Sequence, residues 1–207
     1  MSRTIKHALI VCHPAPESFV AGMAARYART VQAHGQDVVV RDLYRLGFDP
    51  VLEDEERHGH PKADVPAEWA ALGKPDVFVL VYPIWFGTPP AMLKGYIDRV
   101  FGAGRMFGLG GEAAAGSKLE GTRLVSLTSS GAMRAWLGEK GVLGSLRTVF
   151  DRYLSDVFGF TETARYHFDG VGPDMTAHDA ERHLLEVERA ARDIMARLRP
   201  AWNPPEV

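Results

Sequence analysis

The sequence predicts an α/β fold in which a five-stranded parallel sheet lies between two layers of helices. Short apolar runs rich in β-branched residues alternate along the chain with longer segments in which apolar residues recur every three or four positions. The short runs are almost continuously apolar, as strands covered on both faces of a sheet are. Because strand and helix alternate throughout, we expect parallel strands joined by right-handed crossovers.

The strands are predicted at residues 7–12, 38–40, 76–82, 123–128 and 161–168. A first helix is predicted from Ser18, a capping residue, to residue 34, where Gly35 ends it. A second starts at the proline pair 89–90 and ends near residue 102, and a third covers residues 142–158. The last begins at a Thr176/Asp179 capping box and is closed by Pro200.

Two connections stand out between these elements. The charge run at residues 53–57 is interpreted as a solvated loop. The glycine-rich stretch at residues 102–121 is long for a connection, and such loops are often lids or contacts with a partner.

Composition limits the classes of function. The 207 residues are 46% apolar and 24% charged, which is typical of one globular domain, so a single domain over residues 1–207 is expected. Lysine and arginine number 24 against 26 acidic residues, which leaves no broad cationic surface for nucleic acid. No apolar run approaches the roughly 20 residues that span a bilayer, and the start lacks the apolar stretch of a signal peptide. With a single cysteine, Cys12, the protein is expected to be cytoplasmic and not membrane-embedded.

Ligands of such folds bind beyond the carboxyl ends of the strands, which directs attention to three loops. The first places His13 and Ser18 at the start of a helix, where free N–H groups and a partial positive charge favour a phosphate. A Ser18 that only caps the helix and a surface His13 explain this loop equally well. The loop matches neither the P-loop nor the dinucleotide-binding glycine motif.

The second and third loops add aromatic and hydroxyl side chains. Trp85 and Phe86 follow a buried strand, where exposed rings favour a flat aromatic ligand, and Gly87 lets the backbone approach it. The alternative is that both rings pack as core. Residues 128–131, Thr-Ser-Ser-Gly, form a tight turn that is weak evidence by itself.

Together these motifs resemble the flavodoxin-like NAD(P)H:quinone oxidoreductases, the NAD(P)H dehydrogenase (quinone) family. The specific part is the ordered set Tyr-Pro-Ile-Trp-Phe-Gly at 82–87, Leu-Lys-Gly at 93–95 and Asp-Arg-Val-Phe at 98–101. The resemblance implies a flavodoxin-like three-layer sandwich and a homodimer with shared sites. It also implies hydride transfer from NAD(P)H through bound FMN, or alternatively FAD, to a quinone or another flat aromatic acceptor. No catalytic side chain is assigned, because the flavin carries the chemistry.

The resemblance assigns binding residues position by position. Contacts to the flavin phosphate and ribityl chain fall to His13, Ser18, Phe19 and Val20, although the family often has Asn at the last of these positions. The residues assigned to the flavin ring are Pro83, Ile84, Trp85, Phe86 and Gly87, which line it. Its polar side is assigned to Thr128, Ser129, Ser130 and Gly131. The substrate pocket is assigned to Trp85, Phe86, Phe107 and Trp136.

Some features depart from the family pattern or remain open. Trp136 stands where family members have Tyr and Val142 where they have His, so a Tyr/His charge relay is not supported. FMN is favoured over FAD because little sequence follows the last helix to cover an adenosine half. The apolar stripe Tyr96, Ile97, Val100 and Phe101 is either a dimer face or core.

Two other functions remain as alternatives. One is a one-electron carrier of the flavodoxin type, which the net charge of −2 disfavours. The other is a regulatory subunit of a potassium efflux system. The remaining histidines, His167 and His183 among them, are scattered, and His58 with His60 lacks a third metal ligand, so no metal site is expected.

Overall fold

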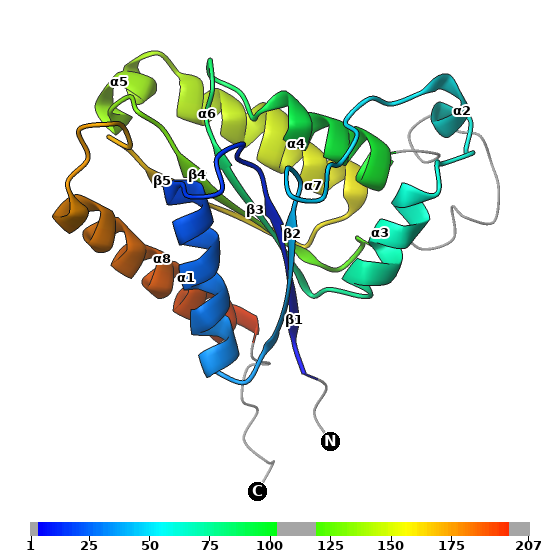
Figure 1. Cartoon of the computed structure of the whole chain (residues 1–207), viewed down its shortest axis with the longest axis horizontal. Helices are drawn as coiled ribbons and strands as arrows, with labels where there is room; N and C mark the ends of the chain where they lie inside the picture. Colours follow the sequence, from blue (N-terminus) through cyan, green and yellow to red (C-terminus); the bar gives the residue numbers. More distant parts are fainter. Residues whose placement is uncertain (1–3, 103–118, 199–207) are drawn as a thin grey trace, which may run out of the picture.

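The computed structural model describes residues 4–102 and 119–198. Its sheet is five-stranded and wholly parallel, in the order β2-β1-β3-β4-β5 (Figure 1). The strands are β1 (Lys6–Val11), β2 (Asp37–Asp42), β3 (Val77–Pro83), β4 (Arg123–Ser129) and β5 (Glu162–Phe168). The expected number of strands, their direction and the two helical layers are therefore confirmed.

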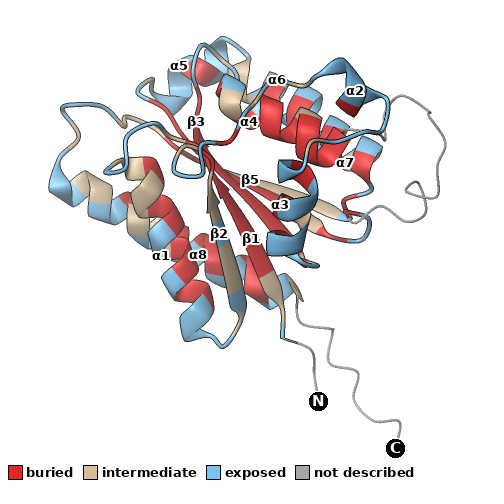
Figure 2. Ribbon diagram, turned by 45° about the vertical axis from the view of Figure 1, so that its right-hand side comes forward, coloured by how far each residue is buried: buried red, intermediate tan, exposed pale blue. Residues whose placement is uncertain are grey.

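Helices cover both faces of this sheet. Helices α1 (Phe19–Ala33) and α8 (Ala177–Leu198) lie side by side on one face, over Leu9, Val79 and Leu127. The other face carries α3 (Asp64–Leu72), α4 (Ala91–Tyr96), α6 (Val142–Leu146) and α7 (Tyr153–Phe158). Every residue of β3 is buried, as Figure 2 shows for the middle of the sheet, which explains why this strand reads as an unbroken apolar run.

Local sequence signals explain the helix boundaries. The Ser18 hydroxyl accepts the Ala21 N–H at 3.2 Å and begins α1, and Thr176 accepts the Asp179 N–H at 3.1 Å ahead of α8. The second and third predicted helices are each continued by π-helical turns, η1 (Ile97–Gly102) after α4 and η3 (Arg147–Arg152) between α6 and α7.

The prediction that residues 53–57 form a solvated loop is wrong. They form the short helix α2 (Asp54–Arg57), in which Glu56 is fully buried. The buried Arg99 guanidinium donates to Glu56 at 2.8 Å and to Asp64 at 2.7 Å. A guanidinium removed from water needs carboxylate partners, and this requirement draws the charge run onto η1.

The sequence prediction also missed α3 and the short helix α5 (Arg134–Glu139). The apolar stripe on α4 and η1 is resolved in favour of core, because Tyr96, Ile97, Val100 and Phe101 are all buried within the single chain. Within the ranges described, no helix combines the length and apolarity that crossing a membrane requires.

Candidate functional site

The three predicted loops lie together at the carboxyl edge of the sheet. The strand hydrogen-bond ladders continue into them: the Cys12 N–H donates to Val81 O at 2.9 Å, and the Ile84 N–H donates to Ser129 O at 2.7 Å. The imidazole of His13 lies 6.0 Å from the Trp85 ring between centroids. The parallel topology thus brings residues separated by more than 100 positions to one edge.

The first loop leads into the N-terminus of α1. The first-turn N–H groups of Phe19 and Val20 have no acceptor within a helix, and no acidic side chain lies in that turn to offset the positive end of the dipole. His13 Nδ1 accepts the Ala15 N–H at 3.1 Å, and in the tautomer that this bond requires Nε2 has the hydrogen. The Val20 side chain is buried against the core, so only its amide can reach a ligand.

The second loop is a tight and strained turn. Trp85 and Thr88 exchange two backbone hydrogen bonds of 3.0 Å, and the two residues between them, Phe86 and Gly87, have φ values of 49° and 81°. Positive φ at both central positions is typical of primed hairpin turns, but an aromatic residue adopts it at a cost of roughly 1–2 kcal/mol. The strain holds the Phe86 ring fully in solvent.

This geometry rejects the alternative that both rings are core. The Phe86 side chain is fully exposed and that of Trp85 is 39% exposed. Pro83 and Ile84, by contrast, are buried and support the turn from below. Strained backbone and exposed apolar area at the carboxyl edge are features of binding sites.

The third loop turns its Thr128 and Ser130 hydroxyls inward. Thr128, Ser129 and Ser130 are buried, and only Gly131 is exposed. The Thr128 hydroxyl lies 3.0 Å from Nδ1 of His167, and the Ser130 hydroxyl lies 3.1 Å from Nε2 of the same ring. Sequence reasoning left His167 among the scattered histidines, because neither a motif nor a period marks it.

His167 is held neutral. Burial, the cationic Arg134 and Arg165 and the neighbouring His183 together lower its pKa to about 4, against the opposing effect of Asp169. At neutral pH the ring therefore has one donor and one acceptor nitrogen, which matches two hydroxyl partners.

The remaining predicted residues surround these loops. Trp136 lies on α5 and is 51% exposed. Val142 lies beside the aromatic turn, since a Cβ on Gly87 would be 3.8 Å from its Cγ1. Phe107 lies outside the described residues. In the described ranges, no group of three or more His, Cys, Asp or Glu side chains could hold a metal ion.

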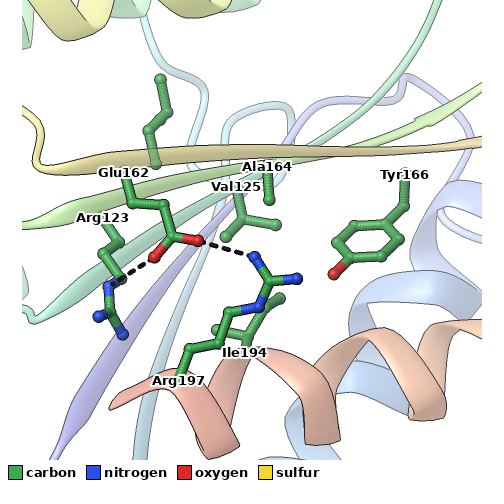
Figure 3. Close-up of a pocket in the computed structure, with 8 residues that line it drawn as sticks. Arg123, Val125, Glu162, Ala164, Tyr166, Ile194 and Arg197 are labelled. Carbon is green, nitrogen blue, oxygen red and sulfur yellow. Dashed lines mark hydrogen bonds and ion pairs between the residues drawn. The ribbon is translucent and has the colours of Figure 1, made fainter.

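A cavity of about 500 Å³ adjoins the third loop and is lined in part by Gly131, Asp169, Arg182 and His183. The His183 ring packs 5.9 Å from that of Phe19, so the cavity lies next to the first turn of α1. A second, apolar cavity lies at the opposite, amino edge of the sheet (Figure 3). Its volume of about 10 Å³ is enough for about one water molecule and excludes a cofactor.

The site fits a flavin in its chemistry. Helix N–H groups and a histidine donor suit a phosphate, and exposed aromatic rings on a rigid turn suit a flat ring. The site contains no side-chain arrangement for nucleophilic catalysis among the described residues of the three loops, since the Cys12 thiol is buried and its pKa is raised to about 12.

Comparisons with known proteins agree with this geometry. Residues 5–191 match the protein family described by its flavodoxin-like fold. A protein of Haemophilus influenzae named as an uncharacterized NAD(P)H oxidoreductase is 37% identical over 105 residues, which cover 48% of this chain and 52% of that protein. The chain spans about half the length of the bacterial relatives it matches.

Solved structures extend the similarity over nearly the whole chain. An NAD(P)H:quinone oxidoreductase from Methanothermobacter marburgensis has a TM-score of 0.77 at 26% identity, covering 93% of this chain and 98% of its own. An FMN-dependent NADH-azoreductase from Bacillus anthracis, in complex with FMN, has a TM-score of 0.65 at 16% identity over 92% and 99% of the two chains, which shows a shared fold. From the matched residues, the strand order and these structures, the chain belongs to the family with the flavodoxin-like fold.

Proposed function

We propose that this protein is a flavin-dependent oxidoreductase that transfers hydride from NAD(P)H through FMN to a quinone or a similar flat acceptor. The observation that carries the proposal is the turn at residues 85–88, which holds the Phe86 ring in solvent at positive φ beside the N-terminus of α1. The names of the similar oxidoreductases and quinone reductase support the same reaction class. The proposed protein is a single cytoplasmic domain.

The first loop is proposed to bind the phosphate. The amides of Phe19 and Val20 and Nε2 of His13 are donors, and the helix dipole favours negative charge at this point. Ser18 is committed to capping Ala21 through its oxygen, so its hydroxyl hydrogen is the part that remains for a ligand.

The second and third loops are proposed to hold the ring. When bound, the flavin supplies the two-electron chemistry between NAD(P)H and the acceptor. Trp85 and Phe86 provide apolar surface for flat molecules, and the strained turn keeps them in place without reorganisation. One pocket that accepts NAD(P)H and acceptor in turn leads to ping-pong kinetics.

FMN remains the proposed cofactor, with FAD as the alternative. FMN ends at its phosphate, and the free N–H groups at the N-terminus of α1 can bind that phosphate. An adenosine half requires further room, and the cavity of about 500 Å³ beside His183 is where the described residues offer it. The FMN complex of a protein with the same fold supports the shorter cofactor. The mass of the chromophore released by heat distinguishes the two.

A homodimer is also proposed, through a surface other than the buried stripe of α4 and η1. Val149 on η3 and Tyr153 on α7 are 68% and 53% exposed. They border a groove of about 240 Å³ whose other wall includes Lys94 and Asp98. Exposed apolar side chains beside a groove on neighbouring helices are typical of a surface that packs against a second copy of the chain. Light scattering is expected to give twice the chain mass, and a monomer mass would contradict this.

The decisive experiment on the reaction is anaerobic mixing of the yellow holoprotein with NADH or NADPH. We expect bleaching of the flavin absorbance by at least one of them and its return on adding a quinone. A colourless protein that takes up neither FMN nor FAD would refute the proposal. Flavin that is bound but reduced by neither nucleotide would favour the one-electron carrier.

Phe86→Asn tests the turn itself, because asparagine tolerates positive φ and lacks the ring. We expect the unfolding free energy to stay the same or rise by up to about 1 kcal/mol while the KM for the acceptor rises several-fold. Urea unfolding and steady-state kinetics measure the two effects. An unchanged KM would remove Phe86 from the pocket.

A further inference from the structure

One buried imidazole joins two of the three hydroxyls of the third loop, those of Thr128 and Ser130. His167 lies on β5 directly opposite Thr128 on β4, so the sheet register places its ring beside the end of β4. The ring is buried, with Nδ1 at 3.0 Å from the Thr128 oxygen and Nε2 at 3.1 Å from the Ser130 oxygen. The pairing of β4 with β5 makes this contact between residues that lie far apart in the sequence.

The network assigns the tautomer of His167. The Ser130 hydroxyl donates its only hydrogen to Ala132 O at 2.7 Å, so its oxygen must accept from Nε2. Nε2 therefore has the hydrogen and Nδ1 is an acceptor, to which Thr128 donates. The longer contact of the Thr128 hydroxyl with Tyr166 O, at 3.2 Å, competes for the same hydrogen.

The loop is anchored on both sides of this histidine. The Arg134 guanidinium donates to His167 O, and the Arg134 N–H donates to the Asp169 carboxylate at 2.6 Å. The Val171 N–H donates to Ser130 O at 2.9 Å. The Thr128 and Ser130 hydroxyls are directed into the protein and Ser129 is buried, so Gly131 is the exposed residue of the loop.

We propose that His167 is a positioning residue of the cofactor site, which fixes loop 128–131 so that the main-chain N–H of Gly131, and not the Thr128 and Ser130 hydroxyls, contacts the bound flavin. The Ser130 N–H is already used, since it donates to Phe168 O at 3.0 Å. This inference rests on the proposed function. It refines the expectation that Thr128, Ser129, Ser130 and Gly131 all contact the polar side of the ring. A main-chain donor edge suits ligand atoms that accept hydrogen bonds, such as carbonyl oxygens and ring nitrogens.

The role requires a neutral ring. Charged or titratable groups face it from three elements: Arg134 on α5, Arg165 and Asp169 on and after β5, and His183 on α8. Burial and the two arginines keep the pKa of His167 near 4. Protonation at Nδ1 would remove the acceptor that holds Thr128.

Paired substitutions separate the two hydrogen bonds. His167→Gln retains a donor near the Nε2 position, and His167→Asn retains an acceptor near the Nδ1 position. Each breaks one contact and releases one hydroxyl of the loop from the ring. We expect the loosened loop to bind FMN about tenfold more weakly in each variant, with a shift of the visible flavin band. FMN titration of the apoprotein and the absorbance spectrum are the readouts.

His7→Gln is the matched control. His7 is equally buried between two polar partners, Tyr27 OH at 3.0 Å and Gln36 Oε1 at 2.7 Å, but it lies at the amino end of β1. We expect a similar loss of Tm with FMN affinity and spectrum unchanged. Loss of FMN affinity in the His7 variant would show that general destabilisation explains the His167 result and would overturn the proposal.

A double-mutant cycle tests the route of action. If Ser130 acts through His167, adding Ser130→Ala to His167→Gln weakens FMN binding no further than either change alone. Additive losses would mean that the hydroxyl contacts the flavin directly and would overturn the proposal. Thr128→Val, which preserves shape, gives the same readout should the His167 variants not fold.

The outcomes also distinguish this inference from the proposed function. Wild-type protein that takes up no flavin would refute both. Wild-type protein that binds flavin, with His167 variants that match its affinity and spectrum and lose only Tm, would overturn the positioning role and leave the proposed function standing.

Discussion

The two ends of the sheet each bury a histidine, but only the amino end is closed to solvent. Each end has a buried neutral imidazole between two polar partners, His7 at the amino end and His167 at the carboxyl end. The amino end is closed, with Glu162 bridging Arg123 and Arg197 over a cavity of about 10 Å³ (Figure 3). The carboxyl end leaves Phe86 in solvent on a strained turn.

The difference shows where this fold accepts unfavourable conformations. Strained backbone and exposed aromatic area reduce stability, and both occur next to the free N-terminus of α1. The amino end has no comparable feature among the described residues, because its turns use glycine wherever φ is positive. Backbone strain and exposed aromatic area confined to the carboxyl end support the proposal that the ligand binds there.

The largest expected effect comes from the close packing behind the carboxyl end. A Cβ on Gly95 of α4 would lie 2.2 Å from Pro50 O, in a loop that Arg99 also holds through Asp49 O. Gly95→Ala must displace this backbone, so we expect the unfolding free energy to fall by about 3 kcal/mol. Urea unfolding measures it.

Gly22→Ala on α1 is the matched control. There a Cβ meets only Leu184 Cδ2 at 3.8 Å, an ordinary contact, and alanine favours the helix interior. We expect the unfolding free energy to rise by up to about 1 kcal/mol. Equal effects of the two changes would mean that the loop yields and that the close packing at Pro50 has no structural role.

The next effect is a pH dependence. The pKa of His167 is about 4 in the fold, below the roughly 6.5 of an unfolded chain, so the unfolded state binds the proton first as pH falls. The stabilisation is present above pH 6.5 and is lost between about 6.5 and 4. Between pH 7 and 4.5, wild type should lose about 2 kcal/mol more than His167→Gln.

His7 sharpens this comparison, because burial also lowers its pKa. The His7→Gln protein should therefore also lose less unfolding free energy than wild type between pH 7 and 4.5. Urea unfolding of the flavin-free protein at both pH values measures this. Only the His167 change should alter FMN binding. A His167 variant with the acid loss of wild type would show that this ring is not held neutral.

The periodicity of the chain was enough to predict the fold. Strands such as β3 are continuous apolar runs, and α1 and α8 have caps and long stripes, so their positions follow from local rules. The segments that were missed, α2, α3 and α5, are four to nine residues long. Their stability comes from contacts such as Glu56 with Arg99, 43 positions away, which local patterning does not report.

The site was predictable to the level of its loops. The aromatic motif and Ser18 identified the first two loops, because strand order fixes which strand ends meet. The direction of the Thr128 and Ser130 hydroxyls was not predictable, since it depends on His167, which the register of β4 and β5 places opposite. Side-chain direction at a strand end is a tertiary property.

A smaller effect separates the two ends by ligand binding alone. Gly87 and Gly35 both have positive φ, 81° at the carboxyl end and 74° at the amino end, and a Cβ on either meets nothing closer than 3.8 Å. Alanine at each should therefore cost about 1 kcal/mol of stability. Only Gly87→Ala should weaken FMN binding, by about tenfold. An equal loss of FMN binding in Gly35→Ala would contradict the assignment of the ligand to the carboxyl end.

The smallest expected effect is at the closed amino end. Glu162→Gln removes the partner of Arg123 and Arg197, but the carboxylate is one-third exposed and the Arg197 side chain more than half exposed, so water replaces much of what is lost. We expect a change of less than about 0.5 kcal/mol in unfolding free energy and no change in FMN affinity. A loss of more than about 1.5 kcal/mol in unfolding free energy, or weaker FMN binding, would show that the two ends are coupled through the sheet. The ion pairs of Glu162 would then help to stabilise the strained turn at Phe86.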